Sequence, residues 1–173
     1  MAYNIDKYPL HWALGGADTS GGLEQNAYEL QQLCNFIKEA DIRTYLELGI
    51  AQGYLLRFMK DEMKLKVKGV TLDKYPTHEG LDVTYGKSQD IEIADSYDMI
   101  FVDGDHSYEA VKTDYERFKG KCSFMAFHDI CGHRACEGVK KLWSEIKDKY
   151  EHWSLIAENK EQQSGIGIIW VLA

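Results

Sequence analysis

The segment 44–62 constrains the fold more than any other part of the chain, because a strand pattern, a glycine turn and a helix pattern follow one another directly. Residues 44–48 (TYLEL) are typical of a β-strand, 49–53 begin and end with glycine, and 54–62 have apolar side chains at helical spacing. The alternation continues with predicted strands at 67–72, 97–102 and 123–127 and predicted helices at 106–118 and 136–150. Such alternation is typical of a parallel sheet with helices on both faces.

Three further segments complete the predicted domain. Residues 23–40 have apolar side chains three and four positions apart, which predicts an amphipathic helix against one face of the sheet. Residues 81–85 predict a short strand, after which Ser88 is placed to cap a weak helical turn. The strand patterns at 153–157 and 166–172 follow each other without a helix. The predicted fold class is therefore α/β, with a doubly wound, mostly parallel sheet and a C-terminal antiparallel hairpin.

Length and charge limit the domain organisation and the partners. A chain of 173 residues with 45% hydrophobic residues can form one domain with a full core. We place this domain at 23–173 and predict that 1–22, which ends in a glycine-rich run, is an N-terminal arm. The net charge of −8 disfavours nucleic acid as a partner. We expect a cytoplasmic protein with no membrane partner, because we find no membrane-span or signal pattern and the four cysteines fit free thiols.

The glycine turn predicts a ligand site with a preference for positive charge. Open α/β sheets bind ligands beyond the carboxyl ends of their strands, and Gly49 and Gly53 there would allow close approach of the backbone to a ligand. Glu47 would repel a phosphate and favour an amino or sulfonium group. The three-glycine pattern of a dinucleotide site is absent, which disfavours NAD.

Asp73 follows the second strand, where a carboxylate can accept hydrogen bonds from both hydroxyls of an adenosine ribose. Together with Glu47 and the glycine turn, this acid predicts S-adenosylmethionine (SAM) as the cofactor. The alternative is that Gly49 and Gly53 only shape a tight turn and that both acids are solvated strand ends.

Three longer motifs occur in order: YDMIFVDGDHSY at 97–108, FHDI at 127–130 and GVKKLW at 138–143. On these motifs the chain resembles class I methyltransferases, in particular the small branch related to cephalosporin hydroxylase and macrocin-type O-methyltransferase domains. The resemblance covers about 21–172 and implies a Rossmann-like sheet, SAM as cofactor and O-methylation of a small molecule. Two departures are the sequence at 121–123 (KCS), in place of a usual glycine pair, and the acidic, irregular region 74–86.

The resemblance also implies a magnesium ion at the strand ends. The acids that follow the strands at 97–102 and 123–127 would converge if these strands are neighbours, and oxygen ligands suit magnesium. By resemblance we assign Asp103, Asp105 and Asp129 as metal ligands, with Asp103 also at the cofactor. In the alternative, Asp103 caps a loop and Asp105 caps the following helix, and no metal is bound.

Histidines near the same strand ends are the candidate bases. An acceptor hydroxyl must lose its proton as it attacks the methyl group, and histidine titrates near neutral pH. We predict His106 or His128 in this role, with a slight preference for His106, and count Asp105 among the candidate catalytic residues. The alternative for His128 is packing at the sheet edge.

A rival metal site is conceivable in the loop 128–136, where two histidines and two cysteines could bind zinc: His128, Cys131, His133 and Cys136. The spacing is crowded for one centre, and Cys136 begins a predicted helix. We therefore favour this loop as lining of a substrate pocket.

The sequence thus predicts a SAM-dependent methyltransferase that acts on an oxygen of a small-molecule acceptor, such as a sugar or another metabolite. The competing hypothesis is a module that binds SAM or S-adenosylhomocysteine (SAH) without turnover. The short chain leaves little room for a substrate domain, so that the arm and loops or a second subunit of a homo-oligomer would complete the pocket.

Overall fold

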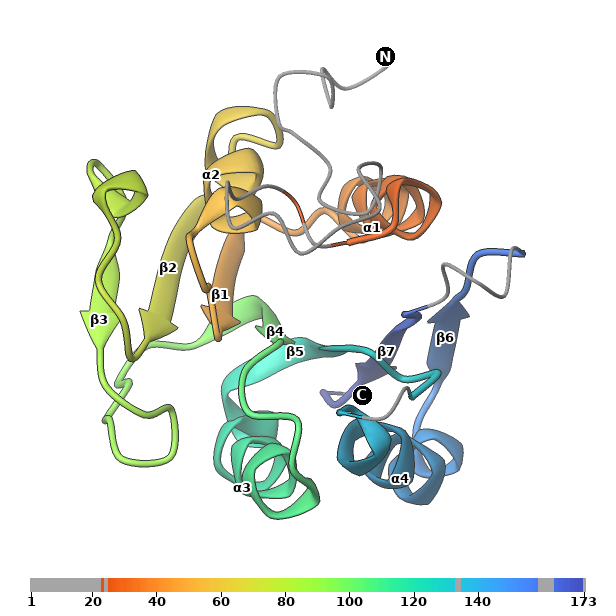
Figure 1. The fold of residues 1–173 in the computed structure, drawn as a ribbon. Helices are drawn as coiled ribbons and strands as arrows, with labels where there is room; N and C mark the ends of the chain where they lie inside the picture. Colours follow the sequence, from red (N-terminus) through yellow and green to blue (C-terminus); the bar gives the residue numbers. More distant parts are fainter. Residues whose placement is uncertain (1–22, 24, 133–134, 159–163, 173) are drawn as a thin grey trace.

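The computed structural model describes residues 23, 25–132, 135–158 and 164–172. In this part of the chain the strands form one seven-stranded sheet with the order β3-β2-β1-β4-β5-β7-β6 (Figure 1). The strands are β1 (Thr44–Leu48), β2 (Lys66–Thr71), β3 (Val83–Tyr85), β4 (Tyr97–Val102), β5 (Cys122–His128), β6 (His152–Leu155) and β7 (Ile166–Trp170). Neighbours are parallel except at β7, which is antiparallel to both β5 and β6. The predicted fold class is confirmed.

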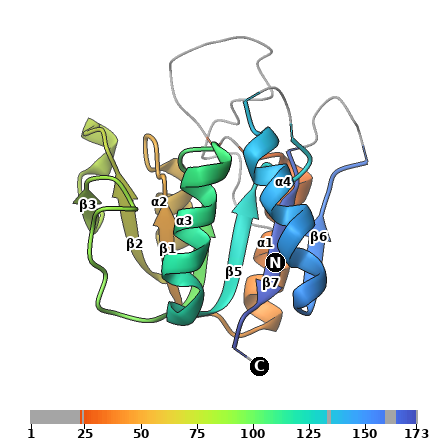
Figure 2. The same cartoon turned by 90° about the horizontal axis from the view of Figure 1, so that it is seen from below.

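Helices cover both faces of the sheet. α1 (Ala27–Glu39) and α2 (Tyr54–Asp61) lie on one face, and α3 (Tyr108–Phe118) and α4 (Glu137–Ile146) lie on the other (Figure 1, Figure 2). Short 3₁₀ turns are η3 (Pro76–His78), η4 (Lys119–Lys121) and η5 (Lys147–Lys149). None of the helices in the described part of the chain is long and apolar enough to cross a membrane.

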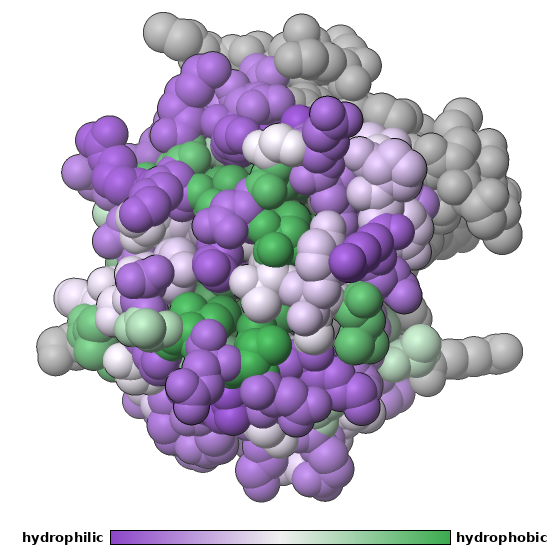
Figure 3. All heavy atoms as spheres, turned by 90° about the vertical axis from the view of Figure 1, so that its left-hand side faces the viewer, coloured by the Kyte–Doolittle hydropathy of each residue, from purple (hydrophilic) through white to green (hydrophobic). Residues whose placement is uncertain are grey.

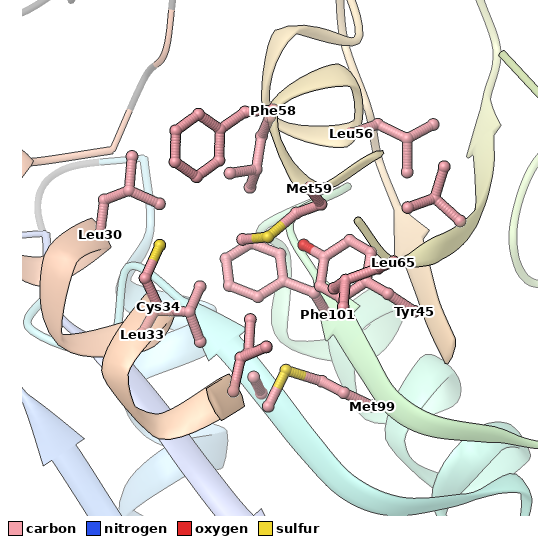
Figure 4. Close-up of a cluster of buried hydrophobic side chains, with 14 of the residues drawn as sticks. Leu30, Leu33, Cys34, Tyr45, Leu56, Phe58, Met59, Leu65, Met99 and Phe101 are labelled. Atoms are coloured by element: carbon pink, nitrogen blue, oxygen red, sulfur yellow. The ribbon is translucent and has the colours of Figure 1, made fainter. Parts of the chain in front are cut away.

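Each face of the sheet has its own hydrophobic core. The core beneath α1 and α2 draws on these two helices, on β1 and β4 and on the residue before β2 (Figure 4). It includes Leu30, Leu33, Cys34, Tyr45, Leu56, Phe58, Met59, Leu65, Met99 and Phe101. Burial of a side chain of this size contributes about 1.5–3 kcal/mol relative to full exposure. These apolar positions therefore fix which face of each helix meets the sheet.

Most predicted elements are confirmed, with shifts at their ends. The first helix begins at Ala27 rather than at residue 23, because the Asn26 side chain accepts hydrogen bonds from the amides of Tyr28 and Glu29 and so caps it. The last predicted helix is α-helical only to Ile146 and continues as η5. The predicted arm 1–22 lies outside the described residues, so the domain boundaries stay predictions.

A buried carboxylate joins the first helix to the end of the chain. Glu29 of α1 has no exposed surface, and its two oxygens accept hydrogen bonds from the amides of Ala157 and Gly165, both at 3.0 Å. These amides lie after β6 and before β7. Gly165 and Ser164 in turn accept hydrogen bonds from Ile130 and Cys131, directly after β5. Glu29 thus connects α1 with the loop between β6 and β7 and, through that loop, with the segment that follows β5. We call this arrangement the Glu29 clamp.

Candidate active site

A cavity of about 320 Å³ lies at the carboxyl ends of the central parallel strands. Segments that follow β1, β2, β3 and β4 line it, which is the position where open α/β sheets bind ligands. The lining residues are Gly49, Ala51, Val70, Thr71, Leu72, Asp73, Gly86, Lys87, Ser88, Gln89, Asp103, Gly104 and Asp105. Three predicted cofactor residues, Gly49, Asp73 and Asp103, therefore share one cavity.

Gly49 lies where two strands come too close for any side chain. Its amide donates to the carbonyl oxygen of Val70 at 2.9 Å, and its φ is +93°. A Cβ added there would overlap the carbonyl oxygen of Asp103 and the Cα of Gly104. The backbone after β1 is thereby pressed against the backbone after β4, which brings both segments to the cavity.

The short turn η3 holds the rest of the glycine turn in place. His78 is buried, and its Nε2 donates to the carbonyl oxygen of Ala51 at 2.8 Å, while the Thr77 hydroxyl donates to the carbonyl oxygen of Gln52 at 2.6 Å. Ala51 has a φ of +42°, a conformation that costs energy in a residue other than glycine. The region 74–86, which looked irregular in the sequence, thus supports the cavity wall.

The other two predicted cofactor residues, Glu47 and Gly53, are not among the residues that line the cavity. Glu47 is buried within β1, where its charge contributes to a raised pKa of the buried Tyr45, although burial of that phenol is the larger cause. Gly53 precedes α2 with a φ of +79° and packs against His78. Their assignment to the cofactor stays a prediction.

Beside the cavity, four side chains from the ends of β4 and β5 form a compact group that we call the acid–imidazole cluster: Asp103, His106, His128 and Asp129. His106 Nε2 lies 3.5 Å from Asp103 Oδ1 and 3.1 Å from Asp129 Oδ2. His128 Nδ1 lies 3.2 Å and 3.4 Å from the same two oxygens. The carboxyl ends of β4 and β5 therefore converge as predicted, because these strands are neighbours in the sheet.

The cluster favours two negative carboxylates and two positive imidazoles. Burial raises the pKa of Asp103, but the charge of His128 and hydrogen bonds from both histidines lower it below its ordinary value. The pKa of Asp129 is lowered in the same way, by bonds from both histidines that outweigh burial. Hydrogen bonds to Asp103 and Asp129 raise the pKa of His106 to about 9, and the same acids overcome burial to raise the pKa of His128.

The two histidines differ in accessibility. The side chain of His128 is 5% exposed, whereas that of His106 is 30% exposed. An acceptor molecule can therefore reach His106 far more readily than His128. Asp129, between them, has a φ of +64°, and non-glycine residues held in this region are concentrated at functional sites.

Asp105 is not part of the acid–imidazole cluster. It is exposed at the cavity rim, and its carboxylate accepts a hydrogen bond from the Ser107 amide at 2.9 Å, just before α3. This bond lowers the pKa of Asp105. The geometry favours the alternative role of Asp105 as a local cap, and its assignments to metal binding and catalysis stay predictions.

Two residues join the cluster that the sequence analysis did not assign to it. Gln25 is buried, and its Nε2 donates to Asp103 Oδ2 at 3.1 Å. Cys136 lies close enough to His106 and Asp129 for the three side chains to bind one metal ion. Burial raises the pKa of the Cys136 thiol, and the negative charge of Asp129 raises it further. Gln25 precedes α1 and is 78 residues from Asp103 in the sequence, so that only the packing of the chain reveals this contact.

The rival zinc set is not brought together in the described part of the chain, because His128 and Cys136 belong to different groups of possible metal ligands. Cys136 pairs with His106 and Asp129 rather than with Cys131, and His133 lies outside the described residues. Among the described residues, two sets of side chains have possible metal-ligand atoms within 4.8 Å of one another. One set is His106, Asp129 and Cys136, and the other is Asp103, His128 and Asp129.

The sequence matches no protein-family model and no curated protein. The structure is similar to a candidate caffeoyl-CoA O-methyltransferase from Staphylococcus aureus, with a TM-score of 0.64 and 15% identity, covering 96% of this chain and 87% of that one. It is also similar to the O-methyltransferase TomG of Streptomyces achromogenes, which is involved in tomaymycin synthesis and was solved with SAM (TM-score 0.63, 12% identity, 88% and 83% covered).

A third similar structure, the N-methyltransferase NodS of Bradyrhizobium japonicum solved with SAH, has a TM-score of 0.59 and 12% identity, covering 86% of this chain and 89% of that one. Identities this low establish the fold alone. The strand order, the antiparallel β7 and these structures agree with the fold that the sequence motifs implied. The chain therefore has the fold of the class I SAM-dependent methyltransferases.

Proposed function

We propose that this protein is a SAM-dependent methyltransferase that methylates an oxygen of a small molecule, such as a sugar or another metabolite. The observation that carries the proposal is the single cavity in which Gly49, Asp73 and Asp103 meet, beside the acid–imidazole cluster. SAM would place its ribose at Asp73, and its sulfonium would be stabilised by the negative charge at the ends of β1 and β4. The fold neighbours include both an O- and an N-methyltransferase, so oxygen as the acceptor atom rests on the cluster and the resemblance.

The exposed apolar surface at the cavity supports a ligand with a flat apolar part. Leu72 lines the cavity and is 63% exposed, and Tyr75 and Tyr85 are exposed nearby in the chain. Tyr85 belongs to β3, and on the side of the molecule that carries β3 hydrophobic residues are interspersed among hydrophilic ones (Figure 3). A nucleoside base over Leu72 would remove this surface from water.

His106 is the better placed of the two predicted bases. It is partly exposed, whereas His128 is buried between Asp103 and Asp129. With a pKa of about 9, His106 becomes neutral only at alkaline pH. In that form, with Nε2–H donated to the carboxylates, its imidazole would accept the proton of an acceptor hydroxyl at Nδ1. In this proposal His128 is a positioning residue, which holds the two carboxylates that orient His106.

Magnesium, the metal predicted from the acids, does not fit the described donors well. Magnesium prefers oxygen ligands, but the groups at this site offer two carboxylates together with two imidazoles and a thiol. Nitrogen and sulfur donors suit zinc or ferrous iron better. The roles proposed for His106 and His128 in methyl transfer do not require magnesium.

Metal preference can be measured without an acceptor. Zinc at 100 times its dissociation constant should stabilise the protein by about 2.7 kcal/mol, and so raise the melting temperature by roughly 5 to 10 °C. Magnesium in the millimolar range should have little effect. The His106→Ala variant, which lacks one nitrogen donor, should respond more weakly to zinc. Stabilisation by magnesium alone would instead support the oxygen-ligand site predicted from the sequence.

The proposed function itself is tested by isothermal titration with SAM and SAH, with NAD as the negative control. We expect SAM and SAH to bind and NAD not to bind, because the cavity has an acid for the ribose but no glycine-rich pyrophosphate turn. The Asp73→Asn variant should bind SAH about 10-fold more weakly, since an amide accepts only part of the diol hydrogen bonding. Absence of SAH binding to the wild-type protein would refute the proposal.

The alternative function, a SAM-binding module without turnover, predicts the same titration but no SAH release from SAM in the presence of hydroxylated acceptors. Formation of SAH with any member of an acceptor panel decides for the enzyme. The homo-oligomer, the absence of nucleic-acid and membrane partners and the cytoplasmic location stay predictions.

A further inference from the structure

An acid that the proposed function does not use is buried behind the cavity. Asp114 lies on the sheet-facing side of α3 with no exposed surface. Its Oδ1 accepts a hydrogen bond from Gln89 Nε2 at 2.9 Å, whereas its Oδ2 has no hydrogen-bond partner among the described residues. Burial of a carboxyl group with one unpaired oxygen is costly, and this group contacts a residue that lines the cavity.

The hydrogen bonds fix which end of the Gln89 amide faces the cavity. Both protons of Nε2 are used inside the protein, one by Asp114 Oδ1 and one by Ser88 Oγ, each at 2.9 Å. An ionised carboxylate only accepts hydrogen bonds, so it must meet the NH₂ end of the amide. The carbonyl oxygen Oε1 is then the polar atom that Gln89 can offer to a ligand.

The position of Gln89 along the cavity indicates which part of a nucleoside it would meet. The cavity extends from the glycine turn past Asp73 to the segment 86–89. If the ribose lies at Asp73 and the methionine part lies toward Gly49, the base occupies the remaining end. Gln89 then contacts the edge of the base.

We propose that Asp114 is a positioning residue that fixes the Gln89 amide with its oxygen toward the cofactor base, and so selects a purine with an amino group at C6 over a 6-oxo purine. This inference rests on the proposed function. A 6-amino group donates a hydrogen bond to Oε1, whereas a 6-oxo group would place two acceptor oxygens against each other. The selection would therefore favour SAH over S-inosylhomocysteine, its deaminated analogue.

The test compares the dissociation constants of SAH and S-inosylhomocysteine by isothermal titration. At pH 8, above the pKa of about 6 to which burial raises the Asp114 carboxyl, the carboxylate is ionised. We expect wild-type protein to bind SAH about 10- to 100-fold more tightly than the inosyl analogue, the discrimination given by one buried polar mismatch. In Asp114→Asn the new amide can either donate or accept a hydrogen bond, so the Gln89 amide can turn its NH₂ group toward the cavity. The ratio of the two dissociation constants should then fall to about 3 or less.

Two further variants make the result specific. Asp90→Asn removes the same charge from an exposed side chain next to Gln89 and should retain the wild-type ratio. Gln89→Leu removes the acceptor oxygen and should also abolish the discrimination, which keeps the test decisive if Asp114→Asn does not fold. The ratio is the diagnostic quantity, because a merely structural loss would weaken both ligands equally.

The outcomes separate this inference from the proposed function. Failure of SAH to bind the wild-type protein overturns both. Binding of SAH without preference over the inosyl analogue, or a preference that Asp114→Asn and Gln89→Leu leave unchanged, overturns only the inference about Asp114. A ratio that falls in these two variants and not in Asp90→Asn supports it.

Discussion

Gly49→Ala should abolish measurable SAH binding and lower the free energy of unfolding by about 3 to 5 kcal/mol, the combined cost of overpacking and of a left-handed backbone in a residue with a Cβ. The added Cβ would overlap backbone atoms of Asp103 and Gly104, which no side-chain rotation can relieve. The segments after β1 and β4 must then separate, and both line the cavity. Urea denaturation and isothermal titration with SAH measure the two effects.

Gly80→Ala is the matched control for this variant. Gly80 also has a positive φ, +76°, but an added Cβ meets no atom within 4 Å. Gly80→Ala should therefore lower the free energy of unfolding only by the backbone cost of about 1 kcal/mol and leave the affinity for SAH unchanged. If Gly49→Ala bound SAH as well as Gly80→Ala does, the close contact at Gly49 would not shape the cofactor site.

The second large effect is a loss of stability at alkaline pH. In metal-free protein, the contribution of His106 to the free energy of unfolding should fall by about 3 kcal/mol between pH 6 and pH 10, given an unfolded pKa near 6.5 and a folded pKa of about 9. The folded state holds the His106 proton more tightly than the unfolded state, so this stabilisation is complete below about pH 6.5 and is lost as the pH rises through about 9.

The difference between wild-type protein and His106→Gln isolates this contribution from other titrating groups. Urea denaturation in EDTA at a series of pH values should show the wild-type advantage shrinking above pH 7. His152→Gln is the control, because His152 lies in β6 and makes an edge-to-face contact with Trp143, away from the acid–imidazole cluster. An advantage that stayed constant across this range would show that Asp103 and Asp129 do not hold the proton on His106.

The fold was predictable because each element carries its own local pattern. Strands and helices alternate along the chain, and in each of them the spacing of the apolar residues marks the face that becomes buried. The helices that cover the sheet could therefore be located from the sequence. The position of β7 was not predictable in the same way. The pattern indicated a hairpin, but not that its second strand would lie between β5 and β6, because lateral order depends on contacts distant in sequence.

The candidate site was predictable only where topology alone brings residues together. Asp103 and Asp129 follow adjacent parallel strands, and the carboxyl ends of such strands meet by construction. Asp105 is two residues from Asp103, yet its carboxylate turns to the Ser107 amide, a local bond that strand topology does not predict. Gln25 and Gln89 reach the site from segments outside the strands, so only packing reveals them.

The Glu29 clamp sets an order of events during synthesis on the ribosome. The α1 helix emerges early, but the amides that satisfy its buried carboxylate belong to Ala157 and Gly165, more than 120 residues later. The edge of β5 also stays open until β7 arrives to pair with it. The nascent chain therefore cannot bury Glu29 with its amide partners or cover the edge of β5 until β7 has left the exit tunnel, and the open strand edge makes this interval prone to aggregation.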